Sequence, residues 1–303
     1  MNNFNVSVII PVLNGDKYIE RAIESAIPLD SVVEVIVIDD GSTDSSLDIC
    51  KRLATLNSKI KVLTHKGNVH KGVSASRNLG IYNAQSPFIA FLDADDYYLP
   101  NRFDSEKQLF NKHIDFDGAY GATKIINTVT GRSELYTYSQ IIPPELLFKA
   151  LVWQNYGHFH ISTLTIRKKT LIQAGMFDVK MPVAEDTELF FRIANIGRIY
   201  TGNISTPISI RTIHNDNTII KHKSKYTIYN KYLYKKILKL FLFSTHTSFN
   251  NKNEIILMLN HHNILFSEVM NEKKFLIKLC ITYPLLFICP FIYHKYFQLI
   301  RHK

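Results

Sequence analysis

The stretch Val32-Val-Glu-Val-Ile-Val-Ile-Asp39-Asp40-Gly41-Ser42-Thr43-Asp44 indicates the fold class of this 303-residue chain. Its first part is apolar and mostly β-branched, which is typical of a buried strand, and the Asp, Gly and Ser residues that follow predict the turn that ends it. Residues 45–56 then place apolar side chains at helical spacing. A buried strand that passes through a turn into a helix is the repeating unit of α/β proteins.

The same alternation of strand and helix continues on both sides of this stretch. Short apolar runs predict strands at 4–12, 60–64 and 88–92, and the segments between them predict helices at 16–27 and 74–84. The later part of the chain is expected to add helices at 102–113, 143–152, 169–174 and 185–196 and strands at 118–127, 164–167, 199–200 and 208–211. Because the strands are apolar along nearly their whole length, we expect a mostly parallel sheet that is flanked by helices on both faces.

The excess of positive over negative charge is confined to the C-terminal part of the chain. The net charge is +10, but residues 1–220 carry 22 Lys and Arg against 23 Asp and Glu, whereas residues 221–303 carry 14 against 3. Such an asymmetry predicts two regions with different roles. We expect a near-neutral domain at 1–220 and a basic helical region, rich in aromatic and aliphatic side chains, at 221–303.

The overall composition excludes several classes of protein. With 46% hydrophobic and 20% charged residues, the chain has enough apolar material for a core and is not intrinsically disordered. It lacks a charge-free apolar run of about 18–20 residues, the length that a membrane-spanning helix needs. Its three cysteines are widely spaced, which predicts neither a disulfide framework nor a zinc site and fits a reducing cytoplasm.

Acidic side chains follow two of the predicted strands. Asp39 and Asp40 end one strand, and Asp93, Asp95 and Asp96 follow another. Helix capping could account for Asp40, Ser42 and Asp44, but it does not account for three carboxylates within residues 93–96. Ligands of open parallel sheets bind beyond the carboxyl ends of the strands, and clustered carboxylates repel one another unless a cation joins them. The pattern predicts Mg²⁺ or Mn²⁺ that binds together with substrate phosphates.

The usual nucleotide-binding loops are missing from the sequence. There is no G-x-G-x-x-G after the first strand and no G-x-x-x-x-G-K-[ST] anywhere. Their absence argues against a dinucleotide-dependent dehydrogenase and against a P-loop NTPase. A nucleotide that binds as a metal complex needs neither loop.

Several short segments resemble the family 2 glycosyltransferases in their residues, order and spacing. The segments are VSVIIPVLN at 6–14, VIVIDDGSTD at 35–44, KGVSASRN at 71–78, FLDADD at 91–96, AGMFD at 174–178 and EDTEL at 185–189. The resemblance covers residues 5–215. It implies the GT-A fold, a Rossmann-like α/β domain, and transfer of a sugar from a nucleotide diphosphate donor with inversion at the anomeric carbon.

The resemblance also implies roles for individual residues. Asp186 matches the general base of the family, although acids at this place also suit the first turn of a helix, where they interact favourably with the helix dipole. The expected metal ligands are Asp95, Asp96 and His214. The residues expected around the nucleotide sugar are Pro11, Asn14, Asp40, Arg77, Asp93 and Asp95.

The segment 153–162, Trp-Gln-Asn-Tyr-Gly-His-Phe-His-Ile-Ser, is a candidate acceptor site because aromatic faces stack on the apolar side of sugar rings. The alternative is that Trp153 and Phe159 belong to the core and that His158 and His160 lie on the surface of a loop. The candidate acceptor-binding residues are Trp153, His158 and Glu185.

The basic region at 221–303 interleaves Lys with Tyr, Ile, Leu and Phe. Basic and aromatic residues together also suit single-stranded nucleic acid, and a solvated pair of helices is the simplest alternative. The apolar content is too high for either, and Pro284 and Pro290 would interrupt a spanning helix. We therefore expect a cytoplasmic protein that binds no nucleic acid and lies on the inner face of the cytoplasmic membrane, held by apolar burial and by attraction to anionic lipid.

The leading functional hypothesis is an inverting, metal-dependent glycosyltransferase. It would use a UDP-sugar to extend a glycan or a lipid-linked saccharide in lipopolysaccharide or capsule biosynthesis. A sugar-nucleotide nucleotidyltransferase is the alternative enzyme, but it would need a Gly-rich basic loop after the first strand, which residues 12–15 do not form. A non-catalytic module that binds nucleotide sugars or nucleic acid is a third hypothesis. The acids at 95, 96 and 186 argue against a non-catalytic protein, and the near-neutral charge of residues 1–220 argues against nucleic acid.

Overall fold

A computed structural model describes residues 4–154, 156–181, 183–215 and 217, and four residues further along the chain, which are Leu233, Lys236, Ile237 and Asn251. All of them belong to the first of two compact units, Met1–Lys252. Most of the basic region at 221–303, including Pro284 and Pro290, lies outside the described residues.

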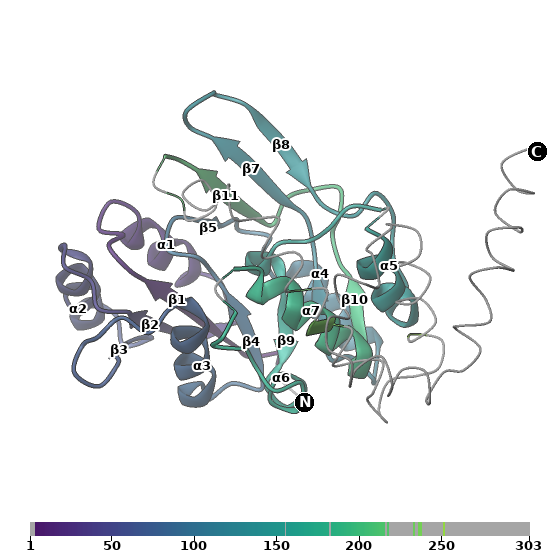
Figure 1. Ribbon diagram of the computed structural model, residues 1–303, viewed down its shortest axis with the longest axis horizontal. Coiled ribbons are helices and arrows are strands. Elements are labelled where there is room, and N and C mark those ends of the chain that lie inside the picture. Colours follow the sequence, from purple (N-terminus) through teal and green to yellow (C-terminus); the bar gives the residue numbers. More distant parts are fainter. Residues whose placement is uncertain are drawn as a thin grey trace, which may run out of the picture. The chain divides into compact units, whose positions relative to one another are not determined.

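A main sheet of seven strands forms the framework of the described part (Figure 1). The strand order is β10-β6-β9-β4-β1-β2-β3. The strands are β1 (Val6–Val12), β2 (Val32–Asp39), β3 (Ile60–Thr64), β4 (Phe88–Phe91), β6 (Gly118–Tyr120), β9 (Thr165–Arg167) and β10 (Ile199–Thr201). All pairs are parallel except those that β9 makes with β4 and β6. The expected α/β class and the mostly parallel sheet are therefore confirmed.

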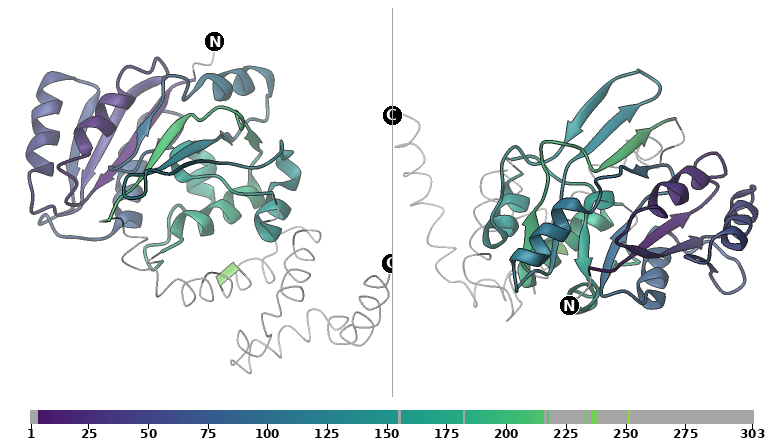
Figure 2. Two further views of the ribbon diagram at one scale, coloured as in Figure 1. Left: turned by 90° about the horizontal axis from the view of Figure 1, so that it is seen from above. Right: turned by 180° about the vertical axis from the view of Figure 1, so that it is seen from behind.

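Helices cover both faces of the main sheet (Figure 2). They are α1 (Ile19–Ala26), α2 (Ser46–Leu56), α3 (Val73–Asn83), α4 (Asp104–Lys112), α5 (Leu147–Trp153), α6 (Lys168–Gln173) and α7 (Glu185–Ile196), with short 3₁₀ turns at η1 (Pro144–Leu146) and η2 (Ile161–Thr163). The even-numbered residues of β1, from Val6 to Val12, join one apolar core with α1 and α2. Ile9 faces the other way, toward α3, where a Cβ on Gly80 would lie 2.6 Å from Ile9 Cγ2. Gly80 thus lets α3 approach the sheet closely.

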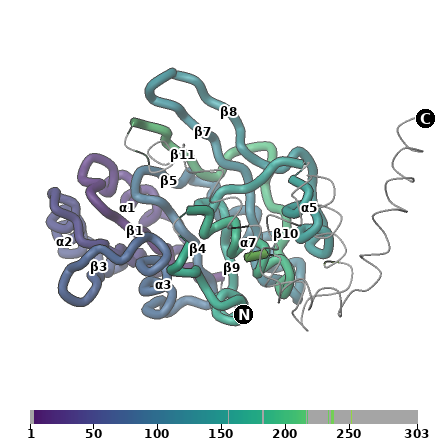
Figure 3. Tube along the Cα trace, in the orientation of Figure 1, coloured from purple at the N-terminus to yellow at the C-terminus, as the bar shows by residue number. Residues whose placement is uncertain are grey.

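A smaller sheet contains the strands β5 (Tyr97–Tyr98), β11 (Ser209–Ile213), β7 (Thr123–Asn127) and β8 (Ser133–Tyr136), in that order across the sheet. The β11–β7 pair is parallel, and the other two pairs are antiparallel. The β7–β8 hairpin extends away from the main sheet (Figure 3).

The single strand expected at 118–127 is wrong, because the chain divides it between the two sheets. β6 ends at Tyr120 and β7 begins at Thr123. Between them, a Cβ on Gly121 would lie 2.8 Å from Asn203 O and 2.7 Å from Ile208 Cδ1, so the backbone turns tightly against 203–208 before it enters the second sheet. The helix expected at 143–152 likewise begins as the 3₁₀ turn η1 and continues as α5.

Three residues of the expected basic region contact the rest of the first unit or are buried within it. Leu233 and Ile237 are buried. Lys236 forms an ion pair with Asp178 and another with Glu188, in which Nζ of Lys236 lies 3.1 Å from Oε1 of Glu188. The expected boundary at residue 220 stays a prediction. Within the described ranges, no helix combines the length and the apolarity needed to cross a membrane.

A buried ion pair supports the turn η2. Arg102 and Glu106 are both fully buried, with Nη1 of Arg102 2.5 Å from Oε1 of Glu106. The same guanidinium donates hydrogen bonds to the carbonyl oxygens of Ser162 and Leu164, at 3.1 and 3.2 Å. Arg102 therefore joins the start of α4 to the residues around η2.

We expect Arg102→Met to lower the free energy of unfolding by about 3–5 kcal/mol, because it leaves a buried carboxylate and two carbonyl oxygens without their donor. Urea unfolding would measure the change. Lys107→Met, at an exposed position of α4, is the matched control and should change the free energy of unfolding by less than about 0.5 kcal/mol. Equal effects of the two variants would contradict a structural role for the buried pair.

Candidate active site

The expected donor-side residues lie where β1, β2 and β4 end. The last paired residues of β1 and β4 are Ile9 and Phe91, and Pro11 lies beyond them. The N–H that Pro11 lacks is therefore not needed for a hydrogen bond between these two strands. Asn14 lies in the turn after β1 with a φ of 52°. Its Oδ1 accepts a hydrogen bond from the backbone N of Thr43 at 2.8 Å, so the loops after β1 and β2 are joined.

The carboxylate of Asp40 is buried and surrounded by donors. The backbone N–H groups of Lys71 and Gly72 donate to it at 2.7 and 2.9 Å. Nδ1 of His70 lies 2.8 Å from Oδ2, and Nε2 of His65 lies 3.4 Å from Oδ1. Asp40 therefore ties the end of β2 to the loop that precedes α3.

Arg77 is a buried cation that links the end of β4 to the start of α7. Its Nη2 donates to Asp93 Oδ1 and its Nη1 donates to Glu185 Oε1, both at 2.7 Å. The guanidinium also lies over the ring of Phe177, 5.1 Å from its centroid. Burial acts to lower the pKa of Arg77, but the charges of Asp93, Glu185 and Asp186 outweigh it and raise that pKa. The side chain stays a permanent cation.

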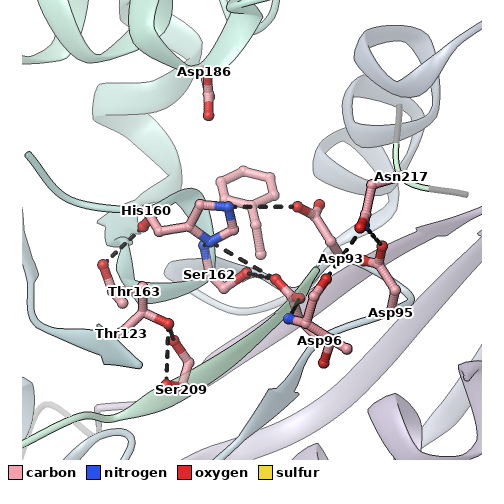
Figure 4. Close-up of polar contacts among 12 residues, drawn as sticks. Asp93, Asp95, Asp96, Thr123, His160, Ser162, Thr163, Asp186, Ser209 and Asn217 are labelled. Carbon is pink, nitrogen blue, oxygen red and sulfur yellow. Dashed lines mark hydrogen bonds and ion pairs between the residues drawn. The ribbon is translucent and has the colours of Figure 1, made fainter. Parts of the chain in front are cut away.

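The three carboxylates after β4 point in different directions (Figure 4). Asp93 faces Arg77, as described above, whereas Asp95 faces His214 and Asn217. Oδ2 of Asp95 lies 3.2 Å from Nε2 of His214 and accepts a hydrogen bond from Nδ2 of Asn217 at 2.7 Å. The fold thus brings together two of the three expected metal ligands.

Asp96, the third expected ligand, is turned into the protein interior. It accepts hydrogen bonds from the backbone N of Thr212 at 2.9 Å and from Oγ of Ser162 at 3.2 Å. Thr212 lies in β11 and Ser162 in η2, so Asp96 joins both elements to the loop after β4.

The pKa values of these carboxyls diverge. Burial acts to raise the pKa of Asp93, but Arg77 outweighs it and holds the pKa below its usual range. Burial and the charge of Asp93 raise the pKa of Asp95. Burial, followed by the charges of Asp95 and Asp93, raises the pKa of Asp96 well above the usual range. A divalent cation would stabilise these carboxylates, and carboxylate oxygens with imidazole nitrogen are suitable ligands for Mn²⁺.

A second potential ligand group includes His160, which belongs to the candidate acceptor segment 153–162 and was not expected near the acids. Ligand atoms of Asp93, Asp96 and His160 all lie within 4.8 Å of one another. His160 is only 7% exposed, so the alternative that placed it on a loop surface is wrong, whereas Phe159 is a core residue as that alternative held. The residues next to His160 in the sequence do not indicate that it lies near acids, because Asp93 and Asp96 are far away along the chain and come close to it only in the folded protein.

Glu185 and Asp186 begin α7, which carries its acidic side chains in the first turn. Glu185 is held by Arg77. Burial and the charge of Asp186 raise the pKa of Glu185, and they outweigh the opposing effect of Arg77. Oδ1 of Asp186 accepts a hydrogen bond from the backbone N of Thr187 at 2.6 Å. The charge of Asp186 also acts to raise the pKa of His160, so Asp186 lies near the same cluster.

The other two candidate acceptor residues, Trp153 and His158, lie at the end of α5 and in the segment that follows it. Trp153 ends α5 and is partly buried. The ring of His158 lies 5.8 Å from that of Phe190 and 6.4 Å from that of Tyr136, measured between centroids. Their contact with an acceptor stays a prediction.

Comparison with known proteins assigns the family. The family described as "Glycosyl transferase family 2" matches residues 7–175, more than half of the sequence. The chain belongs to this family. The matched range contains the donor-side residues and the loop with Asp93, Asp95 and Asp96, and it ends before Asp186.

Two curated relatives show the extent of the likeness. An "Uncharacterized glycosyltransferase" of Rickettsia felis is 29% identical over 197 residues, which are 64% of this chain and 32% of the relative. The "Minor teichoic acid biosynthesis protein GgaA" of Bacillus subtilis is 32% identical over 197 residues, which are 61% of this chain and 42% of that protein. The chain thus spans about a third of the Rickettsia relative and less than half of GgaA.

A solved structure shows the same fold. Residues 1–349 of Staphylococcus aureus TarS, in complex with UDP-GlcNAc, superpose with a TM-score of 0.67 over 93% of this chain and 80% of TarS, at 18% identity. The GT-A fold that the resemblance implied is therefore confirmed.

We expect Arg77→Met to lower the free energy of unfolding by about 3–5 kcal/mol, because Asp93 and Glu185 lose the cation between them. Arg77→Lys should recover part of the loss, since an ammonium restores the charge but cannot reproduce the planar fork that reaches both acids. Urea unfolding would measure both variants. Lys112→Met, at an exposed position of α4, is the control, and an Arg77→Met effect no larger than the control would contradict the bridge.

Proposed function

We propose that this family 2 chain is an inverting glycosyltransferase. It transfers a sugar from a nucleotide diphosphate donor, a UDP-sugar, to a glycan or lipid-linked saccharide in the biosynthesis of a surface polysaccharide such as lipopolysaccharide or capsule. The family supports the reaction class, and the TarS structures with UDP and UDP-GlcNAc support the donor. The name of GgaA supports a role in polysaccharide synthesis.

The observation that carries the proposal is the bridge that Arg77 makes between Asp93 and Glu185. It brings Asp186, the neighbour of Glu185, to the carboxylates that follow β4. An inverting transfer needs a base on one side of the anomeric carbon and stabilisation of a leaving diphosphate on the other. Asp186 of α7 would supply the base, and the acids of the loop after β4 would hold the divalent cation that stabilises the diphosphate.

Asp186 is the proposed base. As the acceptor oxygen bonds to the anomeric carbon, the bond from that carbon to the diphosphate oxygen breaks, and the acceptor proton passes to the carboxylate of Asp186. A positioned base contributes about 10²–10⁴-fold to such a step. Its hydrogen bond to Thr187 N leaves the carboxylate oriented from the start of α7.

The remaining roles concern the donor. Asp40, Pro11 and Asn14 bind the base and ribose at the ends of β1 and β2, while Arg77 and Asp93 act near the ribose and diphosphate. The proposed metal ligands are Asp95 and His214, which lie 3.2 Å apart, whereas Asp96, the third expected ligand, is turned toward Thr212 and Ser162. When bound there, Mg²⁺ or Mn²⁺ would stabilise the charge of the departing diphosphate.

We expect metal-dependent release of UDP from at least one UDP-sugar, abolished by EDTA and restored by Mn²⁺ or Mg²⁺. Asp186→Asn should lower sugar transfer by about 10²–10⁴-fold, because an amide accepts no proton, while UDP affinity stays within about twofold. A coupled assay of UDP release and titration calorimetry would measure the two effects. Asp104→Asn, at an exposed position of α4, is the matched control.

The outcomes separate the competing functions. Incorporation of label from pyrophosphate into a nucleoside triphosphate would indicate a nucleotidyltransferase instead. Failure to release UDP from every donor, combined with tight binding of single-stranded DNA, would indicate a binding module.

The acceptor side and the membrane complete the proposal. Trp153, His158 and Glu185 are the proposed acceptor contacts, and residues 221–303 are the proposed membrane-binding region of a protein on the inner face of the cytoplasmic membrane. The charge of that region, 14 Lys and Arg against 3 acids, supports attraction to anionic lipid.

We expect the full chain to float with vesicles that contain phosphatidylglycerol and to stay in solution with pure phosphatidylcholine vesicles. About 0.5 M salt should weaken the binding, because it screens the charges of Lys and lipid. Flotation in a density gradient measures the bound fraction. Equal recovery with both vesicle types would contradict the electrostatic part of this proposal.

A further inference from the structure

His160 lies at the centre of the acidic cluster, and the proposed reaction gives it no role. Its Nε2 lies 3.9 Å from Oδ2 of Asp93, and its Nδ1 lies 3.8 Å from Oδ2 of Asp96. Figure 4 shows the imidazole between Asp186 and the loop that carries Asp93 and Asp96. The ring is therefore placed between the proposed base and the proposed donor-binding carboxylate.

The ring is anchored through its own backbone. The carbonyl oxygen of His160 accepts hydrogen bonds from the backbone N and from Oγ1 of Thr163, at 2.9 and 2.8 Å. Thr163 is fully buried, and the next turn of chain is held by Arg102 through the carbonyl oxygen of Ser162. Such a side chain can present one atom to a ligand with little loss of conformational entropy on binding.

The contacts of Nδ1 assign the tautomer. The backbone N of Ser162 can only donate, and it lies 3.4 Å from Nδ1 of His160, so Nδ1 is the acceptor. An imidazole whose Nδ1 accepts this hydrogen bond carries no proton on that nitrogen and is therefore neutral. The single ring proton therefore resides on Nε2, which faces Asp93.

Nε2–H of His160 and Oδ2 of Asp93 form a donor and an acceptor that face the same point. At 3.9 Å they are too far apart for a direct hydrogen bond. A hydroxyl between them can accept from Nε2 and donate to Oδ2, each at about 2.8 Å. Oδ1 of Asp93 is committed to Arg77, so Oδ2 is the oxygen that a ligand would meet.

We propose that His160 and Asp93 together bind a hydroxyl group of the transferred sugar, and that His160 thereby helps to select the donor. This inference rests on the proposed function, in which the sugar lies between Asp186 and the donor-binding residues. A neutral imidazole and a carboxylate recognise a hydroxyl by its ability to accept and donate at once. A sugar that lacks this hydroxyl, or carries it in the other configuration, leaves both groups without a partner.

The experiment compares UDP-hexoses with UDP on the full chain. In the presence of Mn²⁺, titration calorimetry would measure the Kd of UDP, UDP-GlcNAc, UDP-glucose and UDP-galactose. We expect His160→Ala to weaken the preferred UDP-hexose by about three- to tenfold, the loss typical of one hydrogen bond, and to change UDP by less than about twofold. His160→Gln, which retains an N–H donor, should recover part of the loss. His113→Ala, at the end of α4, is the matched control.

Several results would overturn the inference. Equal weakening of UDP and of the UDP-hexoses would assign His160 to packing or to the nucleotide. Weaker binding of Mn²⁺ alone, with no difference between UDP and the UDP-hexoses, would assign it to a cation held with Asp93 and Asp96. Failure of the unaltered chain to bind UDP would overturn the proposed function as well as this inference. The other two results would overturn this inference alone, so the two kinds of failure can be told apart.

Discussion

A single buried guanidinium holds the two sides of the candidate site together. Arg77 reaches Asp93 after β4 with one nitrogen and Glu185 at the start of α7 with another. These acids are far apart in the sequence, and burial acts to raise the pKa of each, an effect that the charge of Arg77 opposes. The position of Asp186 relative to the donor-side carboxylates depends on this bridge, because Asp186 follows Glu185 directly in the first turn of α7.

The loop after β4 contains three carboxylates close together, and each of them contacts a different part of the protein. Asp93 is paired with Arg77, Asp95 is paired with His214, and Asp96 accepts hydrogen bonds from η2 and β11. Each carboxylate therefore has a different partner and a different pKa shift. A loop fixed in this way can present carboxylate oxygens to a cation without rearranging, which keeps the cost of binding low.

Much of the main sheet could be predicted from the residues alone. The strands at 32–38 and 60–64 are apolar runs whose periodicity does not fit a helix, and each agrees with a strand of the structure within one residue. The division of 118–127 into β6 and β7 could not be predicted, because it depends on how Gly121 packs against 203–208. The antiparallel direction of β9 depends likewise on its neighbours, which the local sequence does not report.

The sequence by itself determined the α/β class, the acids at the strand ends and their likeness to family 2, because these are local patterns of apolar and charged residues. Only the tertiary structure decided which side chains and backbone groups each acid contacts. It turned Asp96 away from the pair formed by Asp95 and His214, and it brought His160 between Asp93 and Asp96. The physical reason is distance along the chain: such contacts arise only when sheet, helix and loop are packed together, and a sequence pattern reports on neighbours of only a few residues.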